Sequence, residues 1–385
     1  MTITKQSTKM NNNNNFDFSN LDDHPLLRVC VKQAFKNSIN QKSNLSVPKA
    51  FKFNYNSCST PHEHNLSLRS LNSNLPSSPT FLTRAKVGLV SNPPELCEEG
   101  TGGTYFLKDS KNQNVAVFKP QNEDPLSVQN PKRTSSNSNF HFKGILPGEG
   151  SQREVFAYLI DNGFAGVPET RMAEVCHWIF TNENGLPGDR SSNIQSKIGS
   201  VQEFQTNIQC SVDDMGAGLF SVLDVQKIAI LDMLIFNCDR NGGNILVTKD
   251  SHKLIPIDHA FSLPDYKHLT DLQWFEWLTW RQVKKPVLQE IKDFINNLDM
   301  DSIISTATAL KFRQECIFTL KLCYTFIKTA LEHSKTLHEI GKLMCSTDST
   351  HPSTFTQLVT TASEGIEDTS EIFNNFKQLV TSFFQ

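Results

Sequence analysis

The chain has 385 residues, with 37 basic and 40 acidic side chains and a formal net charge of −3. That balance argues against a nucleic-acid-binding protein that works through bulk positive charge. Its nine cysteines are scattered without a C-x-x-C pair, which indicates neither a disulfide framework nor a zinc site. No apolar run approaches the roughly 20 residues needed to span a bilayer. We therefore expect a cytoplasmic protein, and peripheral membrane association stays open.

The first 80 residues differ in composition from the rest. They are rich in Asn, Ser and Lys, contain the run MNNNNNF, and show no sustained apolar periodicity. Such a segment buries too little apolar surface to offset the entropy lost on ordering. We predict a mostly disordered, Asn/Ser-rich tail over residues 1–80.

Short β-type runs separated by turn signals follow from Phe81. Residues 104–108 and 114–119 predict a hairpin joined by the polar turn DSKNQ. Residues 122–144 return to Asn, Ser, Pro and Lys, which is typical of a loop or insertion. Further strand candidates lie between residues 164 and 210.

Helical periodicity dominates the second half of the chain, after an earlier helix that opens at Ser151. Apolar spacing predicts a helix that ends just before Asp239, and a second hairpin of NILV and LIPID follows. Beyond Trp274 the pattern is helical to about residue 345. Residues 365–385 predict one more amphipathic helix.

A polar loop with the sequence CDRNGGN lies between two apolar runs. Asp239 and Asn244 belong to this loop, and Asp258 ends the strand LIPID. This is the layout used for phosphoryl transfer in the kinase fold. Magnesium prefers oxygen ligands, which suits Asn244 and Asp258, while a separate carboxylate, Asp239, would orient or deprotonate the acceptor hydroxyl.

The upstream half supplies matching cations and backbone donors. Strand alternation places Val115, Val117 and Lys119 on one face, so the ammonium lies at the end of an apolar surface fit to cover an adenine. Glu154 would pair with Lys119 and fix its direction. Three glycines would let backbone N–H groups approach the phosphates: Gly100, Gly102 and Gly103.

Each of these elements also has a purely structural interpretation. GTGG matches neither the spaced-glycine loop of protein kinases nor a Walker A motif, and it could be a simple turn. Glu154 could be the third residue of a capping box begun by Ser151. Asp239 and Asn244 could belong to an Asn/Gly-rich turn, and Asp258 could be an ordinary strand-end residue. The order of these four elements along the chain, together with the strand lysine Lys119, favours the functional interpretation.

These segments together resemble a known family: EGTGGTYFLKD, VAVFKP, GEGSQREVFAYLID, GFAGVPET, KIGSVQEF, DRNGGNIL, LIPIDHAFSLP and FEWLTW. They are similar to the catalytic domain of the phosphatidylinositol 3- and 4-kinases, and most similar to the type II and gamma branch of the phosphatidylinositol 4-kinases. The resemblance runs from about Gly100 to about Leu298, with weaker agreement as far as IGKLMC.

The resemblance implies an α+β, bilobal, protein-kinase-like fold, with ATP and Mg²⁺ or Mn²⁺ as cosubstrate and metal. By motif match, Lys119 corresponds to the ATP lysine, Asp239 to the catalytic-loop aspartate, and Asn244 and Asp258 to the metal ligands. The linker between the lobes, where backbone groups would hold the adenine edge, falls at Gln202, Glu203 and Phe204. Many phosphoinositide kinases carry His after Asp-Arg, where this chain has Asn241.

The implied organisation assigns every part of the chain. Residues 1–80 are the tail, residues 81–204 a β-rich N-lobe with the insertion 122–144, residues 205–345 a helical C-lobe, and residues 346–385 a C-terminal tail with a possible helix.

Three tryptophans recur at three-residue spacing, at Trp274, Trp277 and Trp280, and basic residues follow them. This pattern is typical of an interfacial helix on a membrane, or of aromatic residues that fill the C-lobe core.

The expected reaction is transfer of the ATP γ-phosphate to the inositol 4-hydroxyl of phosphatidylinositol at a membrane surface. Two alternatives stay open: a protein Ser/Thr kinase on the same fold, and a catalytically weak ATP-binding scaffold. The expected partners are phosphatidylinositol, ATP and possible protein substrates, without nucleic acid.

Overall fold

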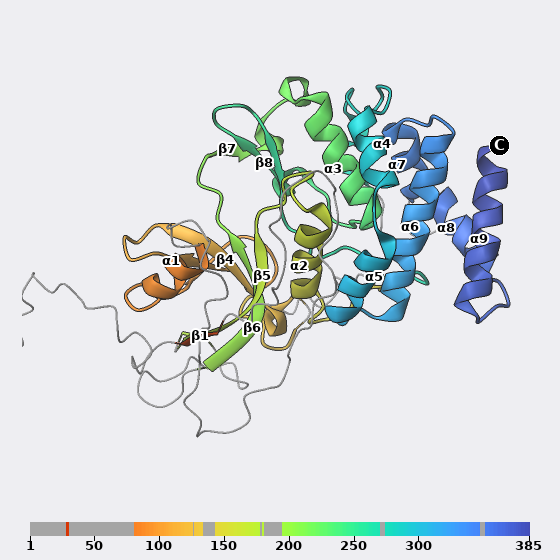
Figure 1. Ribbon diagram of the computed structural model, residues 1–385. Coiled ribbons are helices and arrows are strands. Elements are labelled where there is room, and N and C mark those ends of the chain that lie inside the picture. Colours follow the sequence, from red (N-terminus) through yellow and green to blue (C-terminus); the bar gives the residue numbers. More distant parts are fainter. Residues whose placement is uncertain are drawn as a thin grey trace, which may run out of the picture.

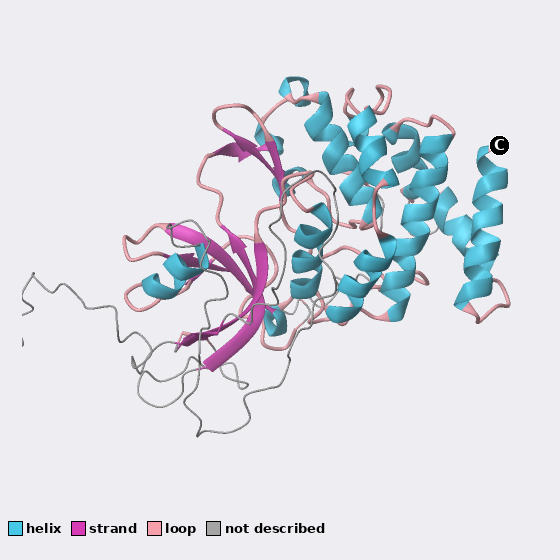
Figure 2. Cartoon of the chain, in the orientation of Figure 1, coloured by secondary structure: helices cyan, strands magenta, loops and turns pink. Residues whose placement is uncertain are grey.

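The computed structural model describes residues 28–30, 81–125, 127–133, 143–177, 179–180, 195–269, 274–346 and 351–385, with side chains for these residues apart from 28–30 and 195. A lobe built on a β-sheet lies on one side and a lobe of helices on the other (Figures 1 and 2). The predicted α+β, bilobal, kinase-like fold is therefore confirmed.

The sheet of the N-lobe is antiparallel and has the strand order β1-β5-β6-β4-β3-β2. Its strands are β1 (Arg28–Cys30), β2 (Glu95–Leu96), β3 (Tyr105–Lys108), β4 (Asn114–Pro120), β5 (Thr170–His177) and β6 (Gln195–Glu203). The predicted hairpin is β3 and β4. Since β4 is paired on both sides, the backbone that carries Lys119 is held firmly in the sheet.

Two helices pack on this sheet. Helix α1 (Phe81–Gly88) contacts β3 and β4, while α2 (Gly150–Asp161) contacts β5 and β6 and lies between the sheet and the helical lobe (Figure 1). The position of α2 between the lobes brings a residue of its first two turns to the strand that carries Lys119.

The structure differs from the sequence prediction at three places in the N-terminal half. The β-type pattern predicted from Phe81 is wrong for residues 81–88, which form α1; Phe81, Ala85 and Leu89 recur every four residues and are buried. Residues 28–30 form β1 inside the range predicted as a tail, and the rest of residues 1–80 lies outside the described part. Within the predicted insertion, Glu123 is fully buried.

The C-lobe combines a small sheet of order β7-β8-β9 with a bundle of helices. The elements are β7 (Ile208–Ser211), α3 (Val222–Leu234), β8 (Ile245–Thr248), β9 (Leu254–Pro256), α4 (Gln289–Asn296), α5 (Met300–Ala309), α6 (Gln314–Glu332), α7 (Leu337–Met344), α8 (Thr354–Ser363) and α9 (Thr369–Phe384). Side-chain caps begin α3, α5, α7, α8 and α9 at Ser221, Asp299, Thr336, Ser353 and Asp368.

Residues 351–385 pack on the C-lobe core through α8 and α9. Helix α9 confirms the predicted amphipathic helix, and α8 is an additional helix that the apolar pattern did not indicate. The ring of Phe355 on α8 contacts Phe236, which lies just before the catalytic loop, at a centroid distance of 5.7 Å. Helix α8 therefore packs against the residues that lead into the loop 237–244.

Two of the three regularly spaced tryptophans, Trp277 and Trp280, are buried in the C-lobe core. Trp277 is fully buried in a short 3₁₀ turn (Glu276–Thr279), Trp280 is buried as well, and Trp274 is half exposed. The described backbone here is not an interfacial α-helix, so that alternative is wrong. No helix in the described part of the chain is long and apolar enough to cross a membrane.

Candidate active site

Lys119 lies between two carboxylates from distant parts of the chain. Its Nζ is 2.5 Å from Glu154 Oε1 on α2 and 2.9 Å from Asp258 Oδ1, which follows β9. Glu154 is almost fully buried, whereas the Lys119 and Asp258 side chains are 24% and 38% exposed. The Lys119 ammonium is therefore anchored by the buried Glu154, while its contact with Asp258 is accessible to a ligand.

The capping-box interpretation of Glu154 is not realised. Helix α2 begins after Glu149 without a side-chain cap, and the Ser151 hydroxyl donates to Lys119 O at 3.0 Å. The second oxygen of Glu154 accepts the His259 backbone N–H at 3.1 Å. Glu154 thus links α2, the β4 lysine and the residue next to Asp258.

The charges of Lys119, Glu154 and Asp258 change the pKa values of Lys119 and Glu154. Burial alone would lower the pKa of Lys119, but the carboxylates of Asp258 and Glu154 outweigh it and raise that pKa. Burial would likewise raise the pKa of Glu154, yet the Lys119 ammonium holds it well below its usual range. Lysine and glutamate therefore both stay charged at neutral pH.

Asp239 lies in a loop whose backbone is closely tied. Its N–H donates to Asn237 Oδ1 at 3.0 Å, and its carbonyl accepts from Asn244 Nδ2 at 2.9 Å. Asn241 Nδ2 donates to Asp239 Oδ1 at 3.1 Å, so the residue that follows Asp-Arg orients the carboxylate. Burial, together with the Asp258 charge, raises the pKa of Asp239, which makes it a stronger base.

A buried polar group that the sequence analysis did not assign to the site positions this loop. Asp232 on α3 accepts from Arg240 Nε at 2.9 and 3.0 Å, from Asn237 Nδ2 at 3.1 Å and from Trp277 Nε1 at 2.9 Å. Arg240 then donates to the carbonyls of Asn244 and Ile257. One ion pair therefore fixes both the catalytic loop and the residue before Asp258. The sequence did contain a signal for this group, because Asp232 is a carboxylate at a core position of an otherwise apolar helix.

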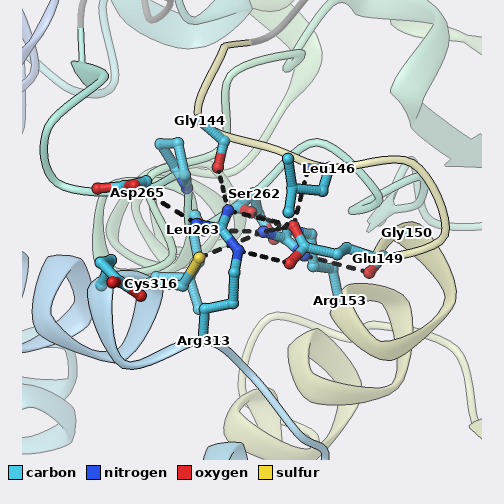
Figure 3. Close-up of polar contacts among 12 residues, drawn as sticks. Gly144, Leu146, Glu149, Gly150, Arg153, Ser262, Leu263, Asp265, Arg313 and Cys316 are labelled. Atoms are coloured by element: carbon cyan, nitrogen blue, oxygen red, sulfur yellow. Dashed lines mark hydrogen bonds and ion pairs between the residues drawn. The ribbon is translucent and has the colours of Figure 1, made fainter. Parts of the chain in front are cut away.

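A second group holds α2 against the segment after Asp258 (Figure 3). The buried guanidinium of Arg153, next to Glu154, donates to the carbonyls of Ser262 and Leu263 at 2.6 and 3.2 Å. It also pairs with Glu149 at 3.0 Å, and Glu149 in turn accepts from Arg313 at the start of α6. These contacts keep α2 in the position where Glu154 reaches Lys119.

The remaining predicted residues occupy neighbouring backbone. The turn with Gly100, Gly102 and Gly103 connects β2 to β3. Gln202 and Glu203 end β6 and Phe204 follows; the N–H groups of Glu203 and Phe204 donate to Glu169 O and Val115 O at 2.8 and 3.0 Å. An adenine at this linker would therefore use other backbone groups, such as carbonyl oxygens.

The residues present fit a hard divalent cation that is shared with phosphate. Asn244 uses its amide N–H on Asp239 O, so its Oδ1 is the oxygen that a cation would use. Asp258, at φ +54°, presents a partly exposed carboxylate from the left-handed region, which Asp tolerates better than most residues. Within the described ranges no cluster of three or more His, Cys, Asp or Glu side chains could hold a metal alone. Phosphate oxygens and water would complete the shell.

A lysine anchored by a helix glutamate, facing a strand-end aspartate and a loop with Asp and Asn, defines a kinase-type phosphotransferase domain. The profile of the family described as Phosphatidylinositol 3- and 4-kinase matches residues 100–340. The chain belongs to this family.

Relatives with assigned names agree. The chain is 38% identical over 309 residues to phosphatidylinositol 4-kinase gamma 4 of Arabidopsis thaliana, which covers 74% of this chain and 52% of the relative. It is 37% identical to gamma 2 of the same plant, over 66% of this chain and 49% of the relative. It is 38% identical to phosphatidylinositol 4-kinase gamma 4 of Oryza sativa subsp. japonica, over 66% of this chain and 45% of the relative. The chain thus matches about half the length of these relatives.

Proposed function

We propose that this protein transfers the γ-phosphate of ATP to the inositol 4-hydroxyl of phosphatidylinositol, with Mg²⁺ or Mn²⁺ as the metal. The observation that carries the proposal is the contact of Lys119 with both Glu154 and Asp258, since this is the arrangement that positions ATP phosphates in kinase sites. The named relatives at 37–38% identity support the lipid acceptor and the ring position.

Each residue has a distinct role in this reaction. Lys119 binds the ATP phosphates, and Glu154 fixes the direction of its ammonium. Asn244 and Asp258 would hold the metal, which neutralises phosphate charge when bound. Asp239 faces the acceptor hydroxyl and receives or orients its proton, helped by its raised pKa and by Asn241.

The lipid substrate requires the protein to work at a membrane surface. We propose that it does so from the cytoplasm as a peripheral protein. The half-exposed Trp274 and the exposed Lys284 and Lys285 are side chains that could meet the lipid surface.

The test offers labelled Mg-ATP to the full chain together with phosphatidylinositol vesicles and a generic protein substrate. We expect label in the lipid, at the 4-position after deacylation and separation of the inositol phosphates. Asp239→Asn should lower transfer by about 1,000-fold or more, while Mg-ATP affinity changes by less than about 3-fold. Asp301→Asn, an exposed aspartate on α5, is the matched control.

Other outcomes would assign the protein differently. Label in protein alone would establish the Ser/Thr kinase alternative. Stabilisation by Mg-ATP in a thermal-shift measurement without transfer to either acceptor would establish the scaffold. Unchanged transfer by Asp239→Asn would refute the role of this residue.

A further inference from the structure

Two consecutive carboxylates follow β4 and take no part in the transfer described above. Glu123 is fully buried at the end of a 3₁₀ turn (Gln121–Glu123), four residues after Lys119, and Asp124 comes next. A buried carboxylate is costly unless it is paired and hydrogen-bonded, so its partners indicate its role.

Every partner of Glu123 belongs to the sheet or to the glycine turn. Gly103 N donates to Glu123 O at 2.8 Å, and Tyr105 Oη donates to Glu123 Oε2 at 2.8 Å. Lys197 Nζ on β6 lies 3.4 Å from Glu123 Oε1. Burial raises the pKa of Glu123, and Tyr105 and Lys197 oppose that rise.

The side chain of Glu123 also fills the space directly behind the glycine turn. A Cβ placed at Gly103 would lie 2.2 Å from Glu123 Oε2 and 2.7 Å from Glu123 Cβ. A side chain at position 103 would therefore push the turn away from Glu123. Glycine at this position serves the close approach of the turn to Glu123.

The same segment holds the other side of the turn. Asn130 Nδ2 donates to Thr101 O at 2.8 Å, and Lys132 donates to the carbonyls of Glu99 and Gly100. The described part of the predicted insertion is thus a support for the turn.

Asp124 connects this support to α2. Its Oδ2 accepts the N–H groups of Gly148 and Gly150, at 2.9 and 3.1 Å, where α2 begins. The two carboxylates therefore join the three elements on which the proposed ATP site depends: the strand of Lys119, the glycine turn, and the helix of Glu154.

We propose that Glu123 is a positioning residue that holds the glycine turn at a fixed place beside Lys119 and thereby sets the affinity for the ATP phosphates. This inference rests on the proposed function only in taking ATP as the substrate. The Gly103 N–H donates to Glu123 O, so it fixes the turn and is not one of the donors offered to the phosphates, contrary to the expectation from the sequence. With the turn fixed, its other backbone donors lose less conformational entropy when the phosphates bind, so a loosened turn costs affinity.

The test measures Mg-ATP binding to the full chain by titration calorimetry, beside steady-state kinetics. Glu123→Gln keeps the size and the backbone carbonyl but removes the charge that faces Lys197. We expect the Kd and the KM for ATP to rise about 10-fold, with kcat and the KM for lipid changed by less than about 2-fold. Glu332→Gln, an exposed glutamate at the end of α6 in the C-lobe, is the control and should leave all four constants unchanged.

A second variant separates positioning from folding. Tyr105→Phe removes only the hydroxyl that donates to Glu123, and we expect the Kd for ATP to rise about 3-fold. Because both changes weaken the hold of the same carboxyl side chain, their effects should not add fully, and the Kd of the double variant should rise by less than the product of the two single changes. Melting temperatures without nucleotide show whether either change acts through stability.

Three results would overturn the inference. One is an unchanged Kd for ATP in Tyr105→Phe and Glu123→Gln, with only a lower melting temperature. Another is an equal loss in kcat and in the KM for lipid, which indicates general damage. A wild-type chain that binds no Mg-ATP would overturn the proposed function as well, and this outcome is distinct from the first two.

Discussion

Two aspartate–cation pairs lie close to the catalytic loop, and they differ in exposure. Asp232 and Arg240 are both completely buried, and Asp232 accepts two further hydrogen bonds from Asn237 and Trp277. In the pair of Asp258 and Lys119 the two side chains are 38% and 24% exposed. The distances are the same, 2.9 Å in each pair.

An ion pair on its own therefore does not mark an active site. The buried pair of Asp232 and Arg240 should remain paired, since separating the two charges would leave each of them unpaired in the core. The exposed pair can exchange its partner for phosphate and metal, because Lys119 keeps Glu154 as a second anion. Comparable substitutions at the two aspartates should then have opposite consequences.

The largest effect is expected at the buried pair. Asp232→Asn would leave the Arg240 charge buried without its anion and place an amide N–H against a neighbouring donor. We expect the free energy of unfolding to fall by about 3–5 kcal/mol, measured by urea denaturation. Asp301→Asn should stay within about 0.5 kcal/mol. A loss of less than about 1 kcal/mol for Asp232→Asn would remove the distinction between the pairs.

At the exposed pair the effect should appear in catalysis. Asp258→Asn should lower kcat/KM by about 100-fold or more, because the change removes a carboxylate that we propose as a metal ligand. The free energy of unfolding should change by less than about 1 kcal/mol, since the side chain is partly exposed and Lys119 stays paired with Glu154. A large loss of stability with retained activity would reverse the assignment of the two pairs.

The smallest effect concerns pH and Asp124, which joins the N-lobe support to α2. Burial raises the pKa of Asp124 from 3.8 to about 6. A raised carboxyl pKa means that the folded protein binds the proton more tightly, so this group's contribution to stability is lost as pH rises from about 4 to about 6. Since Asn does not titrate, the free energy of unfolding of Asp124→Asn minus that of the wild type should rise by roughly 1–3 kcal/mol as pH increases from about 4 to about 6. Above about pH 6 this difference should stay constant.

Urea denaturation of both proteins at several pH values between 4 and 7 measures this difference. A difference that does not vary with pH would show that Asp124 titrates normally in the folded protein.

Much of the fold could be predicted from local patterns. The hairpin of β3 and β4, the helix that carries Glu154, and α3 ahead of the catalytic loop follow from strand alternation and helical spacing. Helix α1 carries the same kind of signal in Phe81, Ala85 and Leu89, but turn residues on either side made the segment resemble short strands.

The candidate site divides in the same way. The sequence could indicate Lys119, Asp239, Asn244 and Asp258 as the proposed site residues, because phosphoryl transfer needs those residue types in that order. Glu123 was not identifiable, because a sequence rich in Asn, Ser and Pro gives no indication that one of its carboxylates is buried behind a glycine turn.

The sequence by itself determined which residue types are available for phosphoryl transfer and in what order, since residue types and their spacing depend only on the chain. The tertiary structure alone decided the partners: Lys119 reaches a glutamate 35 residues away, and Arg153 reaches carbonyls more than 100 residues away. It also decided which carboxylates are buried and which are open to a ligand. Burial and pairing depend on how distant segments pack, and no local pattern in the chain records that packing.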